Sequence, residues 1–264
     1  MTPDDVLTVL NFMDQAPSHV PATLRQGGVL VRYAQAGTPA ASLIRRDAEL
    51  LLALAPHGLG PELLELDLGG RRARHAFSLQ RLPHPGAVQG QEGDGDAVWQ
   101  QLGDHLRRLH SLPILATGDV PPSPDALRLL DHLYEEGVIT DHDLGWLRNW
   151  IMVMQREAGP PQPATLHGAL RPENMLLTPD RRTFLGLVDW SRARPGEAAW
   201  DHVDLPLGAC AVIGAEDPQQ TAALLLAFVT RLLLDLRDAS QGGRALAAAT
   251  SRLFALFQFN RRYA

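Results

Sequence analysis

The stretch "LHGALRPENMLLTPDRRTFLGLVDW" (166–190) contains two short apolar runs, "NMLLT" and "TFLGLVDW", on either side of the turn residues "PDRR". This pattern predicts a β-hairpin over 174–190. A hairpin brings its two ends together, so Asn174 and Asp189 should be neighbours. An amide oxygen beside a carboxylate suits Mg²⁺ that is bound together with a nucleotide's phosphates. Either residue alone is more often the plain start of a turn or end of a strand, and only the residues around the two favour a metal site.

The chain before this hairpin divides by composition. Residues 1–82 contain an apolar run at 27–35, a helical pattern at 44–58, and a two-strand pattern at 61–82 joined through Gly69 and Gly70. A polar, Gly- and Pro-rich segment follows at 83–96 and is typical of a mobile connector. We therefore expect a small α+β N-lobe at 1–82 and a hinge or connector at 83–96.

Helical periodicity dominates from Ala97 onward. The expected helices cover 97–112, 121–137, 140–159, 218–239 and 243–258. Residues 97–264 should form a helical C-lobe, with the hairpin segment 165–190 inserted in it. The fold class expected is α+β and bilobal.

Composition narrows the function classes. A net charge of -6 gives no reason to expect a nucleic-acid partner, because phosphate backbones are normally met by a basic excess. The single cysteine, Cys210, excludes an internal disulfide and reads as a small buried hydrophobe. The apolar run 221–236 is interrupted by Arg231 and falls short of a membrane span. No signal peptide pattern opens the chain, so a cytoplasmic location without a membrane partner is expected.

The loop and its flanks resemble the aminoglycoside phosphotransferase and choline kinase-like family, whose catalytic loop runs His-Gly-Asp, then Pro and Asn. The matching positions are His167, Gly168, Pro172, Asn174, Asp189, Trp190, Gly196, Trp200 and Asp201. Weaker similarity extends over most of 27–206. The resemblance implies a protein-kinase-like fold that binds ATP and Mg²⁺ in the cleft between a strand-rich N-lobe and a larger helical C-lobe.

Site roles follow from the same resemblance. Asn174 and Asp189 would be the Mg²⁺ ligands, His167 would orient the catalytic loop, and Asp201 would steady that loop as a structural acid. The hinge would contact adenine through its backbone, near Gln80, Arg81 and Leu82.

The base position departs from the family pattern. Ala169 stands where the family has its catalytic Asp. A methyl group can neither accept a proton nor orient a hydroxyl, and general-base catalysis is typically worth about 10²–10⁴-fold. Glu173 has the right chemistry but lies next to Asn174, on the other side of the loop pattern, and is a poor substitute.

The phosphate-binding positions also depart from the pattern. The chain has no lysine, so all 24 basic residues are arginines. Arg32 is the candidate for the family's strand residue that binds the phosphates, with Asp47 as its acidic partner and Glu49 in reserve; an exposed strand arginine is an equal alternative. Gly27 and Gly28 are the only candidates for a phosphate-covering turn.

Three functions stay open at this point. The chain is a small-molecule phosphotransferase with impaired or absent transfer, a non-catalytic pseudokinase that senses nucleotide or binds a partner, or an interaction protein that binds nothing in the cleft. The acceptor would be a small hydroxylated molecule. The acids in 131–143 could bind a polycationic antibiotic, whereas the apolar and basic end at 254–264 argues against one.

Overall fold

The computed structural model describes residues 17–116, 123–214 and 218–240. Its residues form two compact units. The first contains residues 1–119 and 164–195, and the second contains residues 120–163 and 196–264. The lobe boundary that we expected at 83–96 stays a prediction, because the compact units divide the chain at other points.

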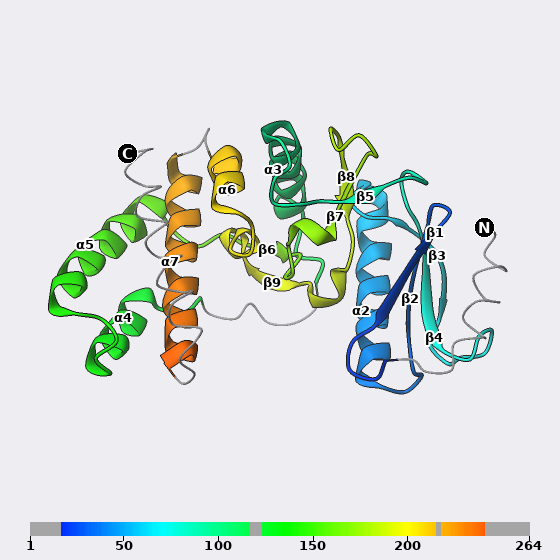
Figure 1. The fold of residues 1–264 in the computed structure, drawn as a ribbon, viewed down its shortest axis with the longest axis horizontal. Coiled ribbons are helices and arrows are strands. Elements are labelled where there is room, and N and C mark those ends of the chain that lie inside the picture. The colour runs from blue at the N-terminus through cyan, green and yellow to red at the C-terminus, as the bar shows by residue number, and fades with distance from the viewer. Residues whose placement is uncertain (1–16, 117–122, 215–217, 241–264) are drawn as a thin grey trace. The chain divides into compact units, whose positions relative to one another are not determined.

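A four-stranded antiparallel sheet organises the first unit (Figure 1). Its spatial order is β1 (Ala22–Gln26), β2 (Val29–Ala34), β4 (Ala76–Arg81) and β3 (Glu62–Asp67). The sequence pattern predicted β2 and the β3–β4 pair but missed β1. The connection between β3 and β4 is longer than a tight turn at Gly69 and Gly70. There, the Asp67 carboxylate accepts the backbone N–H groups of Gly69 and Arg72 at 3.0 and 2.6 Å.

Strand alternation sorts the side chains of β2 between two faces. Val31 and Tyr33 are on one face and pack with Phe77 and Leu79 of β4 in a buried apolar cluster. The alternate residues of β2, including Arg32, therefore point to the opposite face. Helix α2 (Pro39–Leu54) packs on this sheet, and its buried side chains repeat at helical spacing. Arg32 is thus directed by strand geometry toward a buried helix surface.

The predicted hairpin is present. Strands β7 (Met175–Leu177) and β8 (Phe184–Leu187) pair antiparallel. The short strand β5 (Val88–Gln89) adds to β7, and helix α3 (Asp96–His110) packs against β8. Further short elements are η1 (Ala55–His57), η2 (Pro172–Asn174), η3 (Trp190–Arg192), and the paired strands β6 (Pro163–Leu166) and β9 (Arg194–Glu197).

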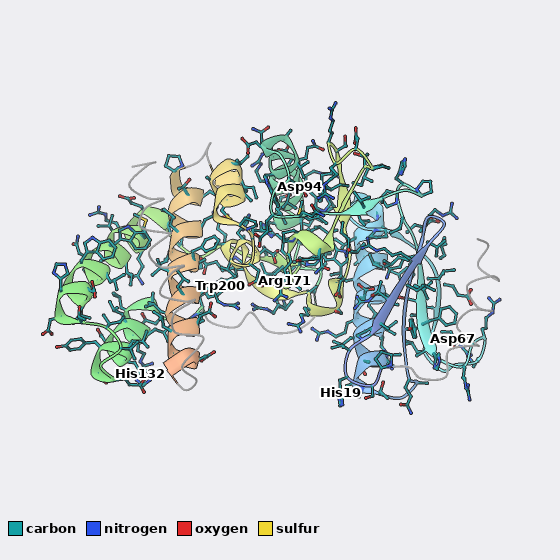
Figure 2. The ribbon with its side chains drawn as sticks, viewed as in Figure 1. His19, Asp67, Asp94, His132, Arg171 and Trp200 are labelled. Atoms are coloured by element: carbon teal, nitrogen blue, oxygen red, sulfur yellow. The ribbon has the colours of Figure 1, made fainter. Side chains whose placement is uncertain are left out.

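The connector at 83–96 is held against the hairpin by specific bonds. Gly90 N–H donates to the Met175 carbonyl at 3.1 Å, and the Gln89 amide donates to the Glu173 carbonyl at 2.9 Å. Asp94, labelled in Figure 2, forms an ion pair with Arg181 at 2.6 Å, and its side chain is only 3% exposed. We had expected a mobile connector from its Gly and Pro content. Strand pairing and this buried ion pair instead fix it beside the catalytic loop.

The second unit is helical. It contains α4 (Ala126–Glu135), α5 (Asp141–Ala158), η4 (Ala198–His202), α6 (Leu207–Gly214) and α7 (Pro218–Ser240). Cys210 is buried, as predicted, and burial raises the pKa of its thiol. The expected helix at 243–258 lies outside the described residues.

Helix α7 is long and apolar enough to cross a membrane by length and composition alone. However, 56% of the relevant window is buried, and α4, α5 and α6 pack against it. Arg231 within this helix forms ion pairs with Asp204 and Asp235. These contacts are those of a helix at the centre of a protein unit.

Replacing Asp94 with Asn should destabilise the first unit by about 2 kcal/mol, because the buried Asp94 carboxylate would lose its charge-assisted bonds to the partly exposed Arg181. Arg181 donates to Oδ1 of Asp94 from two nitrogens, and Gln91 N–H donates to Oδ2. The matched control is Asp104→Asn, which removes the ion pair between Asp104 and Arg107. The Asp104 side chain is 67% exposed, so this substitution should lower the free energy of unfolding by less than about 1 kcal/mol. Urea unfolding monitored by tryptophan fluorescence measures both. Equal losses for the two variants would show that the connector is not held by Asp94.

Stability should also depend on His105, which is buried on α3 edge-to-face against Phe184. Burial lowers the pKa of His105 from 6.5 to about 4. Between these values the unfolded chain takes up a proton that the folded chain excludes, so stability falls as pH falls through this window. Between pH 7 and pH 5 this effect should cost about 2 kcal/mol.

The variant His105→Gln should lose this pH dependence, whereas His142→Gln, at an exposed position on α5, should keep it. Urea unfolding of the three chains at pH 7 and pH 5 provides the comparison. If the free energy of unfolding of His105→Gln falls between pH 7 and pH 5 as much as that of the unmodified chain, His105 is not the group responsible.

Candidate functional site

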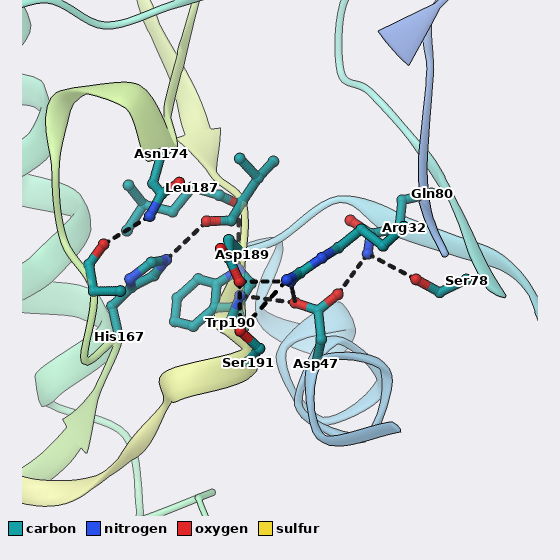
Figure 3. Close-up of polar contacts among 12 residues, drawn as sticks. Arg32, Asp47, Ser78, Gln80, His167, Asn174, Leu187, Asp189, Trp190 and Ser191 are labelled. Carbon is teal, nitrogen blue, oxygen red and sulfur yellow. Dashed lines mark hydrogen bonds and ion pairs between the residues drawn. The ribbon is translucent and has the colours of Figure 1, made fainter. Parts of the chain in front are cut away.

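The candidate site lies within the first unit, where β2, α2 and the end of the hairpin meet (Figure 3). Its centre is the Arg32 guanidinium, whose side chain is 4% exposed. Nη1 of Arg32 lies 3.3 Å from Asp47 Oδ1 and 2.6 Å from Asp189 Oδ1. Arg32 and Asp47 are therefore together, as predicted, and the alternative of an exposed strand arginine is wrong. Glu49, the reserve partner, is exposed on α2.

Asp47 has a complete set of donors. Its Oδ1 accepts the Trp190 backbone N–H at 2.7 Å, and its Oδ2 accepts the Gln80 side-chain amide at 2.6 Å. Burial raises the pKa of Asp47, and these donors together with Arg32 partly offset that effect. Helix α2 places Asp47 on its buried stripe, between Ile44 and Leu51, which is where an unpaired acid would be strongly destabilising.

Gln80 has a different place from the one that the family resemblance suggested. It is fully buried in β4, and its side chain contacts Asp47 and, at 3.4 Å, the Ser78 hydroxyl. Register explains this, because Gln80 pairs with Leu30 and Ser78 pairs with Arg32, so all four side chains share one face. The predicted backbone contact of Gln80 with adenine stays a prediction, and its side chain supports Asp47.

Asp189 sits in an uncommon backbone conformation at the end of the hairpin. Its φ of 65° and ψ of 64° are left-handed, a region that few non-glycine residues adopt outside turns and functional sites. Ser191 Oγ donates to Asp189 Oδ1 at 2.6 Å. Burial alone would raise the pKa of Asp189, but Arg32 and the Ser191 hydroxyl outweigh burial and lower it. Asp189 is therefore ionised at neutral pH, as a metal ligand must be.

Asn174 is the other predicted metal ligand. Its backbone carbonyl accepts the Val188 N–H at 2.9 Å, which places Asn174 beside the strand end that precedes Asp189. Its side-chain NH₂ donates to the Ala169 carbonyl at 2.7 Å, so the amide oxygen is directed away from that bond. One amide oxygen and one carboxylate suit Mg²⁺, which commonly keeps water and phosphate as its other ligands. Within the described residues, no group of three His, Cys, Asp or Glu side chains is arranged to hold a metal ion. A metal ion at Asn174 and Asp189 would therefore need water and phosphate as its other ligands.

The catalytic loop is positioned from its first residue. His167 is fully buried, packs on Trp190 with 4.5 Å between ring centroids, and donates from Nε2 to the Val188 carbonyl at 3.0 Å. The loop start and the strand before Asp189 are thereby joined. These contacts support the predicted orienting role of His167.

Ala169 and Glu173 are both in the loop but in different surroundings. Ala169 is partly exposed and holds Asn174 through its backbone carbonyl only. The Glu173 side chain is exposed in η2, and its backbone carbonyl holds Gln89. No contact directs the Glu173 carboxylate toward Ala169, which leaves its role as a substitute base a prediction. Asp201 is buried in η4 of the second unit, and its structural role also stays a prediction.

The predicted hinge and the glycine turn contact each other. Gly27 and Gly28, both with positive φ, form the two-residue turn between β1 and β2. The Gly28 carbonyl accepts the Leu82 backbone N–H at 2.8 Å. The turn therefore lies against the hinge, and the Leu82 N–H is used within the chain. The predicted contact of the hinge backbone with adenine stays a prediction.

An apolar cluster adjoins this turn. Leu30, Leu82, Leu176 and Val188 pack together, and each is less than 9% exposed. They come from β2, the hinge, β7 and the strand end before Asp189. Sequence periodicity could identify each as buried but not that the four contact one another.

Comparison with known proteins identifies the family of this chain. The model of the phosphotransferase enzyme family matches residues 21–253. An aminoglycoside 3'-phosphotransferase of Streptomyces ribosidificus is 27% identical over 232 residues, which are 76% of this chain and 86% of that protein.

Two solved structures share the fold. A GDP complex of a mutant aminoglycoside 2'-phosphotransferase-IIIa has a TM-score of 0.63 and 18% identity and covers 97% of both chains. The choline kinase LicA from Streptococcus pneumoniae has a TM-score of 0.52 and 14% identity and covers 97% of this chain and 98% of its own. The predicted α+β, protein-kinase-like fold is confirmed.

Gly168 should be irreplaceable in the loop. Its φ is 74°, and a Cβ atom there would lie 2.1 Å from the Arg192 carbonyl oxygen. Gly168→Ala should therefore cost more than about 3 kcal/mol or prevent folding. The control is Gly37→Ala, which has a similar φ of 76° but open space around it, and should cost about 1 kcal/mol from backbone strain alone. Thermal unfolding of both variants separates steric overlap from strain, and equal costs would contradict the close approach.

Proposed function

Because this chain belongs to the phosphotransferase enzyme family, we propose that it binds a purine nucleotide with Mg²⁺ at Asp189 and has impaired phosphoryl transfer to a small hydroxylated acceptor. The observation that carries the proposal is the contrast within one loop. The loop and its surroundings keep side chains of the types that metal and phosphate need, Asn174, Asp189 and Arg32, whereas the base position has only the methyl group of Ala169. ATP is the nucleotide that we propose.

Each residue has a defined task in this proposal. Asn174 and Asp189 would hold the metal ion through one oxygen each. A bound Mg²⁺ would neutralise charge on the phosphates. Asp47, held by Gln80 and Trp190, would anchor Arg32 near the phosphates. His167 would keep the loop against the strand end that carries Asp189.

The missing carboxylate limits the rate. In the family, the residue at position 169 would accept the proton of the attacking hydroxyl, and such bases typically contribute about 10²–10⁴-fold. Positioning and charge neutralisation can still support slow transfer without a base. We therefore expect this chain to bind nucleotide but to transfer the phosphoryl group slowly.

The acids of 131–143 offer little support for a polycationic acceptor. Asp131 forms an ion pair with Arg148, and His132 is 3.4 Å from Glu136. Asp141 accepts the Tyr134 hydroxyl, and Asp143 accepts the Thr140 hydroxyl that begins α5. These local partners favour a smaller hydroxyl compound, without a cluster of positive charges, as the acceptor.

A non-catalytic pseudokinase is the second candidate. The observations that favour it are the Leu82–Gly28 hydrogen bond and the close packing of Leu30, Leu82, Leu176 and Val188. The adenine ring of a nucleotide that enters between the hinge and this apolar cluster would have to displace these contacts. On this alternative, the chain binds nucleotide weakly and acts through a partner. A cytoplasmic location is part of both proposals.

Restoring the carboxylate tests the assignment of Ala169. Ala169→Asp should raise the rate of phosphate release from ATP by about 10²-fold or more, because it restores a carboxylate at the base position. Ala169 is partly exposed, so an Asp side chain can be accommodated there. Thermal shift with ATP and Mg²⁺ should be similar in both chains. Adding Asp189→Asn to Ala169→Asp should abolish the gain.

The outcomes separate the two candidates. Stabilisation by ATP in neither chain would sink the nucleotide-binding proposal and favour the partner-binding alternative. Turnover by the unmodified chain that is lost in Glu173→Gln would show that Glu173 replaces the base, and that transfer is not impaired for the reason given.

A further inference from the structure

The Arg32 guanidinium forms ion pairs with two carboxylates of the chain itself and one hydrogen bond, to Ser191. Nη1 contacts Asp189 at 2.6 Å and Asp47 at 3.3 Å, and Nη2 donates to Ser191 Oγ at 3.4 Å. An arginine fork can serve several oxygens at once, which a lysine ammonium cannot do with the same geometry. Arg32 therefore connects α2 to the predicted metal ligand.

The same Asp189 oxygen, Oδ1, pairs with the Arg32 guanidinium and accepts the hydrogen bond from the Ser191 hydroxyl. The Asp189 side chain is 39% exposed, so the carboxylate is accessible to a metal ion. Asn174 is joined by its backbone carbonyl to Val188, the residue before Asp189. The donor set fits a divalent cation. However, a cation bound there would lie close to the positive guanidinium, and like charges at such a distance repel.

Arg32 is held in this position from the other side. Asp47 is fully buried and is fixed by Trp190 and Gln80, so it cannot follow Arg32 toward another ligand. The one positive charge of Arg32 is therefore shared between the carboxylates of Asp47 and Asp189. Asp189 is partly neutralised before any metal ion arrives.

We propose that Arg32 is a positioning residue that competes with a divalent cation for Asp189, and so sets the metal requirement of the site. This inference rests on the proposed role of Asn174 and Asp189 as metal ligands. When the cation binds, the Arg32–Asp189 contact opens while the Arg32–Asp47 contact stays. The unmodified chain consequently binds divalent cations weakly in the absence of nucleotide.

Metal binding without nucleotide tests the inference. Free Mn²⁺ is measured by electron paramagnetic resonance during titration of the full chain. Arg32→Gln removes the competing charge and should tighten Mn²⁺ binding by about tenfold. Arg32→Lys should change it in the same direction but less, because an ammonium anchored at Asp47 no longer spans both carboxylates.

Two controls define the site. Arg72→Gln removes an exposed arginine that pairs with Glu65 on the same sheet, and should leave Mn²⁺ affinity unchanged. Asp189→Asn added to Arg32→Gln should remove the gain. Thermal unfolding confirms that each chain folds, and Arg32→Lys decides the outcome if Arg32→Gln does not fold.

The inference is overturned if folded Arg32 variants bind Mn²⁺ no more tightly than the unmodified chain, or if none of the chains binds it. A separate thermal-shift titration with ATP, in EDTA and in Mg²⁺, distinguishes this from failure of the proposed function. Stabilisation by ATP should depend more on Mg²⁺ in Arg32→Lys than in the unmodified chain. Absence of any ATP effect with tighter Mn²⁺ binding in the variants would sink nucleotide binding and leave the competition standing.

Discussion

The ion pairs of Arg32 with Asp47 and Asp189 are the interaction on which the site depends. They join strand β2 and helix α2, which are neighbours in sequence, to the end of the hairpin, which lies more than a hundred residues further along the chain. Arg32 and Asp47 are both buried, and removal of one partner from such a pair typically costs about 3–5 kcal/mol. The cluster is therefore part of the fold as well as the place where a metal and phosphates would bind.

The catalytic loop shows how a fold can keep its geometry without its base. His167 is held by Val188 and Trp190, Gly168 by its close approach to Arg192, and Asn174 by the Ala169 carbonyl. Only the last contact involves position 169, and it uses the backbone, which is the same for every residue type. Loss of a carboxylate at this position therefore affects chemistry far more than structure. The intact Asn174 and Asp189 need not mean that transfer is efficient.

Much of the fold could be predicted because periodicity and the hairpin pattern are local signals. The partnership of Arg32 with Asp47 also followed from the family resemblance. Contacts that depend on sheet register could not be predicted. Gln80 was assigned to adenine through its backbone, yet the pairing of Leu30 with Gln80 turns its side chain to Asp47. Ser191 gave no signal, because its role depends on the left-handed backbone of Asp189.

The connector illustrates the same limit. Its Gly and Pro content is a correlation with loops and says nothing of tertiary contacts. Asp94 and Arg181 are far apart in sequence, and their ion pair exists only because β5 pairs with β7. Likewise, the bond between Leu82 and Gly28 extends the β2–β4 ladder by one residue, which a sequence pattern cannot show.

The contact between Arg32 and Asp189 can be observed in solution by nitrogen-15 NMR of the arginine side chains. If Arg32 is bound to Asp189, its guanidinium should show slowed rotation and separate Nη–H signals in the unmodified chain, and those signals should change clearly in Asp189→Asn. Arg32 signals like those of a freely rotating, solvent-exposed arginine, unchanged by Asp189→Asn, would contradict this contact.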